Sequence, residues 1–147
     1  MGSGFVDLLF VVVANLVNLL VAALLVVRVR GWATAERGLG VAVMAMAVPV
    51  GAGIVSNALA RRPWWTIALP ALLVLFCGVE LTLDYILHLN FRYTRLLWPY
   101  LMSYYLALIG MMGYSFGVGK AHGFITLGTY LVNLAATWYS YSRVGHG

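Results

Sequence analysis

Five apolar stretches, each about 20 residues long, make up most of this 147-residue sequence. A helix of about 20 residues, rising about 1.5 Å per residue, crosses a hydrocarbon core about 30 Å thick. The apolar runs are continuous and do not alternate with polar residues at period two, so they predict helices and exclude the strands of a membrane barrel. The predicted spans are 5–27, 39–60, 65–89, 97–118 and 123–141.

The composition excludes the other classes of protein. The chain is 63% hydrophobic and 9% charged, whereas a soluble domain is about 45–50% apolar and about 25% charged. A disordered or disulfide-stapled chain would need high polarity or many cysteines, and Cys77 is the only cysteine here. We therefore expect an all-α, polytopic integral membrane bundle, with 1–147 as a single transmembrane domain, in the cytoplasmic membrane of a prokaryote.

The basic residues predict the orientation of the bundle. Lys and Arg in short loops stay on the cytoplasmic side. An outside N-terminus places six arginines inside (Arg28, Arg30, Arg37, Arg92, Arg95 and Arg143) and three basic residues outside (Arg61, Arg62 and Lys120). We therefore expect the N-terminus outside and the C-terminus inside. Arginines that flank spans also account for the net charge of +5 without a nucleic-acid partner.

Small residues and one proline predict how the helices pack. Helices in lipid associate through close contact of small residues at a spacing of four. The fourth span carries such a face, formed by Ser103, Ala107, Gly110, Gly113 and Gly117, which we expect to meet another helix closely. Pro49 lies in the middle of the second span and predicts a kink there.

The third span carries the only acidic residues that lie within a predicted span and away from its ends. Glu80 and Asp84 are four residues apart, with Cys77 before them and His88 after them. At about 100° per residue these four fall within an arc of roughly 80° and form one polar stripe. An ionised carboxylate at mid-bilayer costs about 2.5–3.5 kcal/mol on insertion scales, so we expect the stripe to face the bundle interior. Arg92 and Arg95, beyond its end, are the expected counter-charges or headgroup anchors.

Polar partners for the stripe are predicted by depth. Asn15 and Asn18 on the first span and Asn133 on the fifth lie at a depth similar to that of Glu80, at about 1.5 Å per residue. We expect the asparagine face of the first span to turn toward the third span. The expected buried cluster comprises Glu80, Asp84, Asn15, Asn18 and Asn133, with the hydroxyl groups of Tyr104, Tyr114 and Tyr130 at its edge.

Two functions compete most closely for this cluster. The first is transport or channel conduction of a proton or a small or organic cation, with Glu80, Asp84, His88, Asn15, Asn18 and Asn133 as the binding residues. The second is a structural or accessory subunit, in which the same groups form a hydrogen-bonded network that fixes helix register.

Two further alternatives are an intramembrane metal-dependent enzyme and a lipid or small-molecule binder. Cys77, Glu80, Asp84 and His88 are all competent metal ligands, but Glu80 and His88 are about 12 Å apart along the helix axis. Tyr93, Tyr100, Tyr104 and Tyr105 would line the cleft of a binder. We expect no cofactor and favour a protein that is not an enzyme. The expected partners are membrane lipids and either further copies of the chain or other subunits of a membrane complex.

Overall fold

The computed structural model describes residues 2–88 and 94–145, and within them the chain is helical with no strand. Six α-helices follow one another, and a π-helical segment, η1, continues the fourth. Their bounds are α1 Ser3–Val29, α2 Ala33–Ala45, α3 Ala47–Leu59, α4 Trp65–Glu80, η1 Leu81–Ile86, α5 Leu97–Val118 and α6 Lys120–Val144. The prediction of an all-α helical bundle is confirmed.

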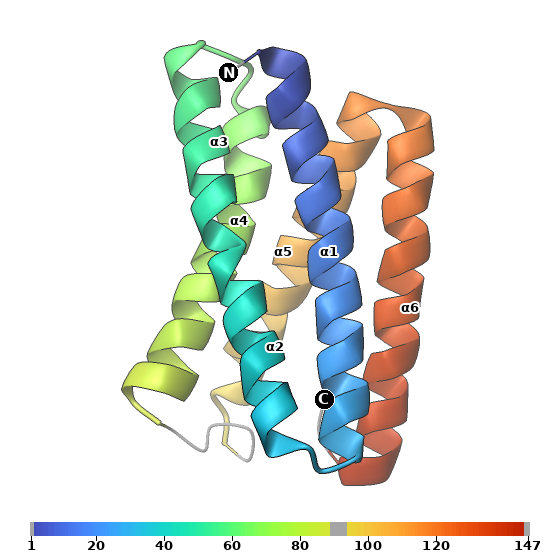
Figure 1. Cartoon of the computed structure of the whole chain (residues 1–147). Helices are drawn as coiled ribbons and strands as arrows, with labels where there is room; N and C mark the ends of the chain where they lie inside the picture. The colour runs from blue at the N-terminus through green and yellow to red at the C-terminus, as the bar shows by residue number, and fades with distance from the viewer. Residues whose placement is uncertain (1, 89–93, 146–147) are drawn as a thin grey trace.

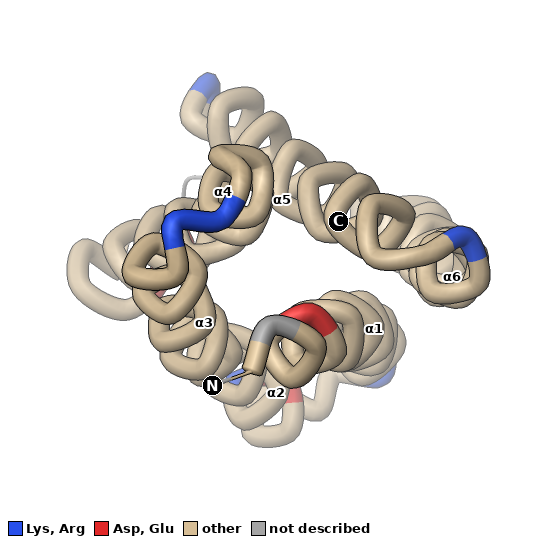
Figure 2. Tube along the Cα trace, turned by 90° about the horizontal axis from the view of Figure 1, so that it is seen from above, with Lys and Arg blue, Asp and Glu red and all other residues tan. Residues whose placement is uncertain are grey.

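The helices form five roughly parallel rods, because α2 and α3 stack end to end and η1 extends α4 (Figure 1). Successive rods run in opposite directions, and the two chain ends lie at opposite ends of the bundle (Figure 1). Seen from above, α3, α4, α5, α6 and α1 follow one another around the bundle (Figure 2). In the described part of the chain, four rods are long and apolar enough to cross a membrane. The fifth, α6, has 25 residues and is more polar.

The second rod is broken at the position that its proline predicts. Helix α2 ends at Ala45 and α3 begins at Ala47. Pro49 has no backbone N–H to donate to the carbonyl of Ala45, four residues earlier, and its ring crowds that carbonyl. The predicted kink is confirmed, and it turns the face of α2 that carries Gly40 and Val43 toward the interior, where both residues are buried.

Close helix contact is clearest between α4 and α5. A Cβ placed on Gly110 would lie 3.1 Å from the carbonyl oxygen of Leu69 and 3.0 Å from Cδ1 of Leu72. Ala107 on the same face is fully buried. Gly117 lies against the ring of Trp65, where a Cβ would be 2.9 Å from the nearest ring atoms. The predicted small-residue face of the fourth span therefore packs on α4.

Helix α1 packs against α2, α3, α5 and α6 and contributes much of the core. The side chains that fill the upper half of the bundle include Phe10, Val50, Leu73, Met111 and Tyr114, all with 2% exposure or less. The rings of Phe10 and Tyr114 pack edge to face, with 5.0 Å between their centroids. This half of the bundle is thus a packed core, and open space lies in the other half.

Candidate functional site

A charged recess occupies the lower end of the bundle, between the end of α1, the start of α2 and the end of α4 with η1. It has a volume of about 440 Å³. A smaller cavity of about 60 Å³ lies next to it, with mainly apolar and aromatic walls. We call the first space the recess and the second the inner cavity. Both are lined by Leu24, Arg28, Gly40 and Glu80, so the two spaces adjoin at Glu80.

The π-helix brings the acidic stripe to the recess. Helix α4 ends at Glu80, and the backbone N–H of Leu87 donates to the carbonyl of Thr82, five residues earlier, at 2.9 Å. Such π segments are rare and often occur at functional sites. Glu80, Asp84 and His88 all line the recess.

Cys77 belongs to a different contact, although the sequence placed it in the same stripe. Its thiol is buried, and Sγ lies 3.9 Å from the carbonyl oxygen of Val43 on α2. The imidazole of His88 lies beside the stripe, and its Nδ1 is 3.1 Å from the backbone carbonyl oxygen of Asp84. The stripe therefore divides into one buried packing residue, Cys77, and three residues that line the recess.

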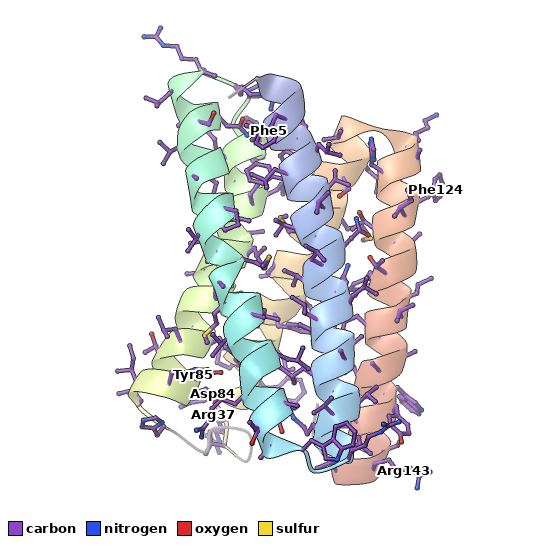
Figure 3. All side chains as sticks on the ribbon, viewed as in Figure 1. Phe5, Arg37, Asp84, Tyr85, Phe124 and Arg143 are labelled. Atoms are coloured by element: carbon purple, nitrogen blue, oxygen red, sulfur yellow. The ribbon has the colours of Figure 1, made fainter. Side chains whose placement is uncertain are left out.

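The two arginines that line the recess lie on either side of the first turn between helices, Arg28 in the last turn of α1 and Arg37 in α2. Arg28 Nε donates to Glu36 Oε1 at 2.7 Å, because Gly31, at a φ of 72°, folds α2 back toward the end of α1. The hydroxyl of Tyr85 donates to the carbonyl of Arg37 at 3.4 Å. Figure 3 shows Arg37, Asp84 and Tyr85 close together at the end of the bundle opposite Phe5 and Phe124.

Among the described residues, the acidic side chains that line the recess outnumber the arginines by one. Three carboxylates (Glu36, Glu80 and Asp84) and two guanidinium groups (Arg28 and Arg37) line it, with His88 taken as neutral. The sequence predicted Arg92 and Arg95 as the cations near Asp84. Arg92 lies outside the described residues, and the arginines that line the recess are Arg28 and Arg37. Gly31, just after Arg28, is the sequence signal that could have identified them, because a glycine there allows a tight turn.

The asparagines of α1 face α6. Asn15 Nδ2 donates to Thr126 Oγ1 at 3.2 Å, and Thr129 Oγ1 donates to Asn15 Oδ1 at 2.9 Å. Asn18 Nδ2 donates to Thr129 Oγ1 at 3.1 Å. The prediction that this face of the first span meets the third span is therefore wrong: the threonines of α6 lie opposite it.

Asn133 extends this network toward the inner cavity. Its Nδ2 donates to Asn18 Oδ1 at 3.4 Å, and the hydroxyl of Tyr104 donates to its Oδ1 at 2.9 Å. Asn18 and Asn133 are 2% and 1% exposed. Tyr104 also lines the inner cavity. The predicted single cluster thus has two parts, an amide and hydroxyl network between α1, α5 and α6 and the carboxylates at the recess.

The network and the carboxylates are separate because they lie at different depths along the bundle. Glu80 borders the same cavity as Val21, Leu24 and Arg28, which follow Asn18 on α1 by one to three helical turns. Counting residues from the membrane face assumes that every helix is straight and equally tilted, which fails in a bundle with a kink and a π segment.

A second polar cluster closes the upper end of the bundle. Arg62, in the loop between α3 and α4, binds Asp7 of α1 through two hydrogen bonds, of 2.7 and 3.1 Å. The hydroxyl of Tyr114 on α5 donates to the same carboxylate, and Arg62 also donates to Asn57 Oδ1 at 3.2 Å. The hydrogen bond to Asp7 raises the pKa of the Arg62 guanidinium above its ordinary value. We call Asp7, Arg62, Tyr114 and Asn57 the upper clamp.

The upper clamp was not predicted from the sequence. Arg62 was interpreted as a basic residue of a loop, and Asp7 lies near the start of the first predicted span. A signal was present: Asp7 lies on the same helical stripe as Asn15 and Asn18, which face the interior. Tyr114, expected beside the asparagines, donates to Asp7 instead.

Residues 2–88 and 94–145 contain no group of three His, Cys, Asp or Glu side chains placed to hold a metal ion. No known family model matches the sequence, and neither the characterised proteins nor the solved structures include one that is similar to it.

Proposed function

We propose that the recess binds a proton or a small cation and that the protein carries it across the membrane. The observation that supports this proposal most directly is the position of Glu80. Glu80 lines both the charged recess and the inner cavity, within a helical segment that is apolar enough to span a membrane. An acidic side chain within a membrane span is costly, and such residues commonly mark ion pathways or proton relays.

The charge balance favours a cation over an anion. Among the described residues that line the recess, carboxylates outnumber guanidinium groups by three to two, which favours a positively charged ligand. Asp84 of η1 and His88, two residues after the end of η1, also line the recess, and we propose that both hold the cation on its way to Glu80. We assign the binding role to Glu80, Asp84 and His88.

The shape of the bundle favours alternating access over an open pore. The recess reaches inward from one end, while a packed core and the upper clamp fill the other. The arginine excess predicts that the recess faces the cytoplasm. Release on the far side would require the upper clamp to separate, which makes Asp7 and Arg62 the second barrier of the cycle.

The asparagine network is poorly suited to carry protons. Hydroxyl groups pass a proton by accepting one and donating another, whereas a side-chain amide accepts on oxygen and donates from nitrogen. Asn15, Asn18 and Asn133 therefore interrupt any hydroxyl chain between Thr126 and Tyr104. We propose that these three residues hold helices together while the carboxylates bind the cation.

A structural subunit is the second candidate. It is favoured by the same network, because the buried amides bind one another and the threonines of α6 across helix interfaces. This candidate predicts a folded protein that moves no ion.

Ion flux into proteoliposomes tests the proposal. Purified protein is reconstituted with a pH-sensitive dye inside, and proton, sodium and potassium gradients are applied in turn. Glu80→Gln keeps the side-chain shape and removes the charge, so we expect it to lower the flux at least about 10-fold, which corresponds to about 1.4 kcal/mol. Asp84→Asn should lower it as well.

Thr82→Val is the matched control on the same π segment. Its hydroxyl is exposed and donates to the carbonyl of Gly78 at 2.8 Å, away from the recess. Its flux should equal that of the wild type. Equal flux for Glu80→Gln and wild type, or no flux of any cation by folded protein, would contradict transport and favour the structural subunit.

A further inference from the structure

The inner cavity has three aromatic walls and one carboxylate. Phe76 of α4 and Tyr100 and Tyr104 of α5 line it, together with Glu80. The ring of Phe76 lies 5.8 Å from that of Tyr100 and 5.4 Å from that of Tyr104, between centroids. The ring planes are inclined at 53° and 58°, so the rings are not stacked and form walls at an angle to one another.

The three rings give the inner cavity an aromatic lining. The hydroxyl of Tyr104 donates to Asn133 Oδ1 at 2.9 Å, which fixes the ring against the cavity. Aromatic faces that converge on one space attract a cation through the ring quadrupole, and such cages are typical of quaternary and alkylated ammonium sites. Glu80 supplies the opposite charge at the mouth of the same space.

The remaining walls count against a bare metal cation. Alkali and alkaline-earth ions that lose their water need several oxygen ligands in its place. Most of the other lining residues are aliphatic, among them Val21, Leu25 and Leu101. Arg28 also lines the cavity, but Glu36 binds its Nε at 2.7 Å and offsets its charge.

We propose that the inner cavity binds the head of a substituted ammonium cation, with its methyl groups against Phe76, Tyr100 and Tyr104 and its charge balanced by Glu80. At about 60 Å³ the cavity holds the equivalent of roughly four to six waters, a size suited to a small alkylammonium group. The recess then accommodates the polar remainder of the ligand. This assignment specifies the substrate class of the proposed transport and rests on it.

Calorimetric titration of the purified protein tests the charge requirement. Choline is compared with 3,3-dimethylbutan-1-ol, its uncharged carbon isostere. We expect choline to bind and the isostere to bind at least about 10-fold more weakly, because only the cation gains from the rings and from Glu80. Equal binding of the two, or no binding of choline, would overturn the assignment.

Aromatic variants test the walls. Phe76→Leu keeps the apolar volume and removes the π face, so choline affinity should fall about 5- to 30-fold. Tyr104→Phe keeps the ring and removes only the hydrogen bond to Asn133, so affinity should change less than about 3-fold. Tyr100→Leu is the second wall variant, for use if Phe76→Leu does not fold.

Phe116→Leu is the matched control, since Phe116 pairs with Phe124 at 5.5 Å and does not line the cavity. Unchanged choline affinity in folded Phe76→Leu and Tyr100→Leu would also overturn the assignment. If proton or alkali-ion flux depends on Glu80 while choline does not bind, transport stands and the ammonium site fails. If choline binds while no cation flux depends on Glu80, transport fails.

Discussion

Asp7 and Arg62 illustrate how single residues stabilise this bundle. Their side chains are 17% and 20% exposed, and two hydrogen bonds join them. The hydroxyl of Tyr114 adds a third bond to the carboxylate. Removing one partner of such a pair leaves a poorly hydrated charge, which costs more than the net stabilisation that the intact pair provides.

Neutralising Asp7 is therefore expected to destabilise the fold. We predict that Asp7→Asn lowers the free energy of unfolding by about 1–3 kcal/mol, less than for a fully buried pair because both groups keep some solvent contact. Titration with a denaturing detergent, followed by tryptophan fluorescence, measures the change. The double variant Asp7→Asn with Arg62→Gln should lose less than the sum of the two single variants.

Arg61 provides the control for Asp7, because it lies next to Arg62 and is exposed. Arg61→Gln should change the free energy of unfolding by about 0.5 kcal/mol or less. If Asp7→Asn costs no more than this, the upper clamp does not hold the helices together.

Helices α1 and α6 are held together by hydrogen-bonded polar side chains and not by the hydrophobic effect. Lipid tails are as apolar as leucine, so interhelical hydrogen bonds and close packing provide the attraction. Asn18 and Asn133 meet within a dry interface, flanked by Thr129 and Tyr104. Helix α6 is the least apolar of the five rods, and its buried face carries Thr126, Asn133 and Ser140.

Asn18→Leu tests the role of this network. The change removes an amide that serves Thr129 and Asn133, so we predict a loss of about 1–2 kcal/mol in the free energy of unfolding. Cation flux of the folded fraction should remain within about 2-fold of wild type, equivalent to about 0.4 kcal/mol. Lost flux with unchanged stability would instead make Asn18 a ligand of the cation.

Local sequence rules predicted some elements and missed others. Pro49 acts on the carbonyl four residues before it, so the break between α2 and α3 follows from the sequence alone. No comparable local rule specifies η1, because its leucines, threonine and tyrosine are compatible with an α-helix. The partner of each helix face was also beyond prediction, since counting residues along the helices assigns polar residues of α4 and α6 to the same depth as the α1 asparagines.

In the whole molecule, the upper clamp and the recess lie at opposite ends of a packed core. The upper clamp closes one end, and the recess opens the other and reaches Glu80 and the inner cavity. The sequence predicted Glu80, Asp84 and His88 as site residues from the cost of charges in a membrane. It did not predict that Arg28, Glu36 and Arg37 complete the recess, because that depends on how α2 folds back along α1.

We propose that water reaches Glu80 from the arginine-rich end of the bundle and from no other side. This proposal is tested most directly by replacing Cys77 with alanine, introducing Glu80→Cys, and adding a membrane-impermeant thiol reagent to either face of the membrane. Lys120→Cys, at the opposite end of the bundle, is the control for sidedness.

We expect Glu80→Cys to react in inside-out vesicles and to be protected in intact cells, whereas Lys120→Cys should show the reverse. A cysteine at position 80 that reacts from neither face would show a dry helix contact in place of the recess. Reaction from the face that labels Lys120→Cys would contradict the closed upper end.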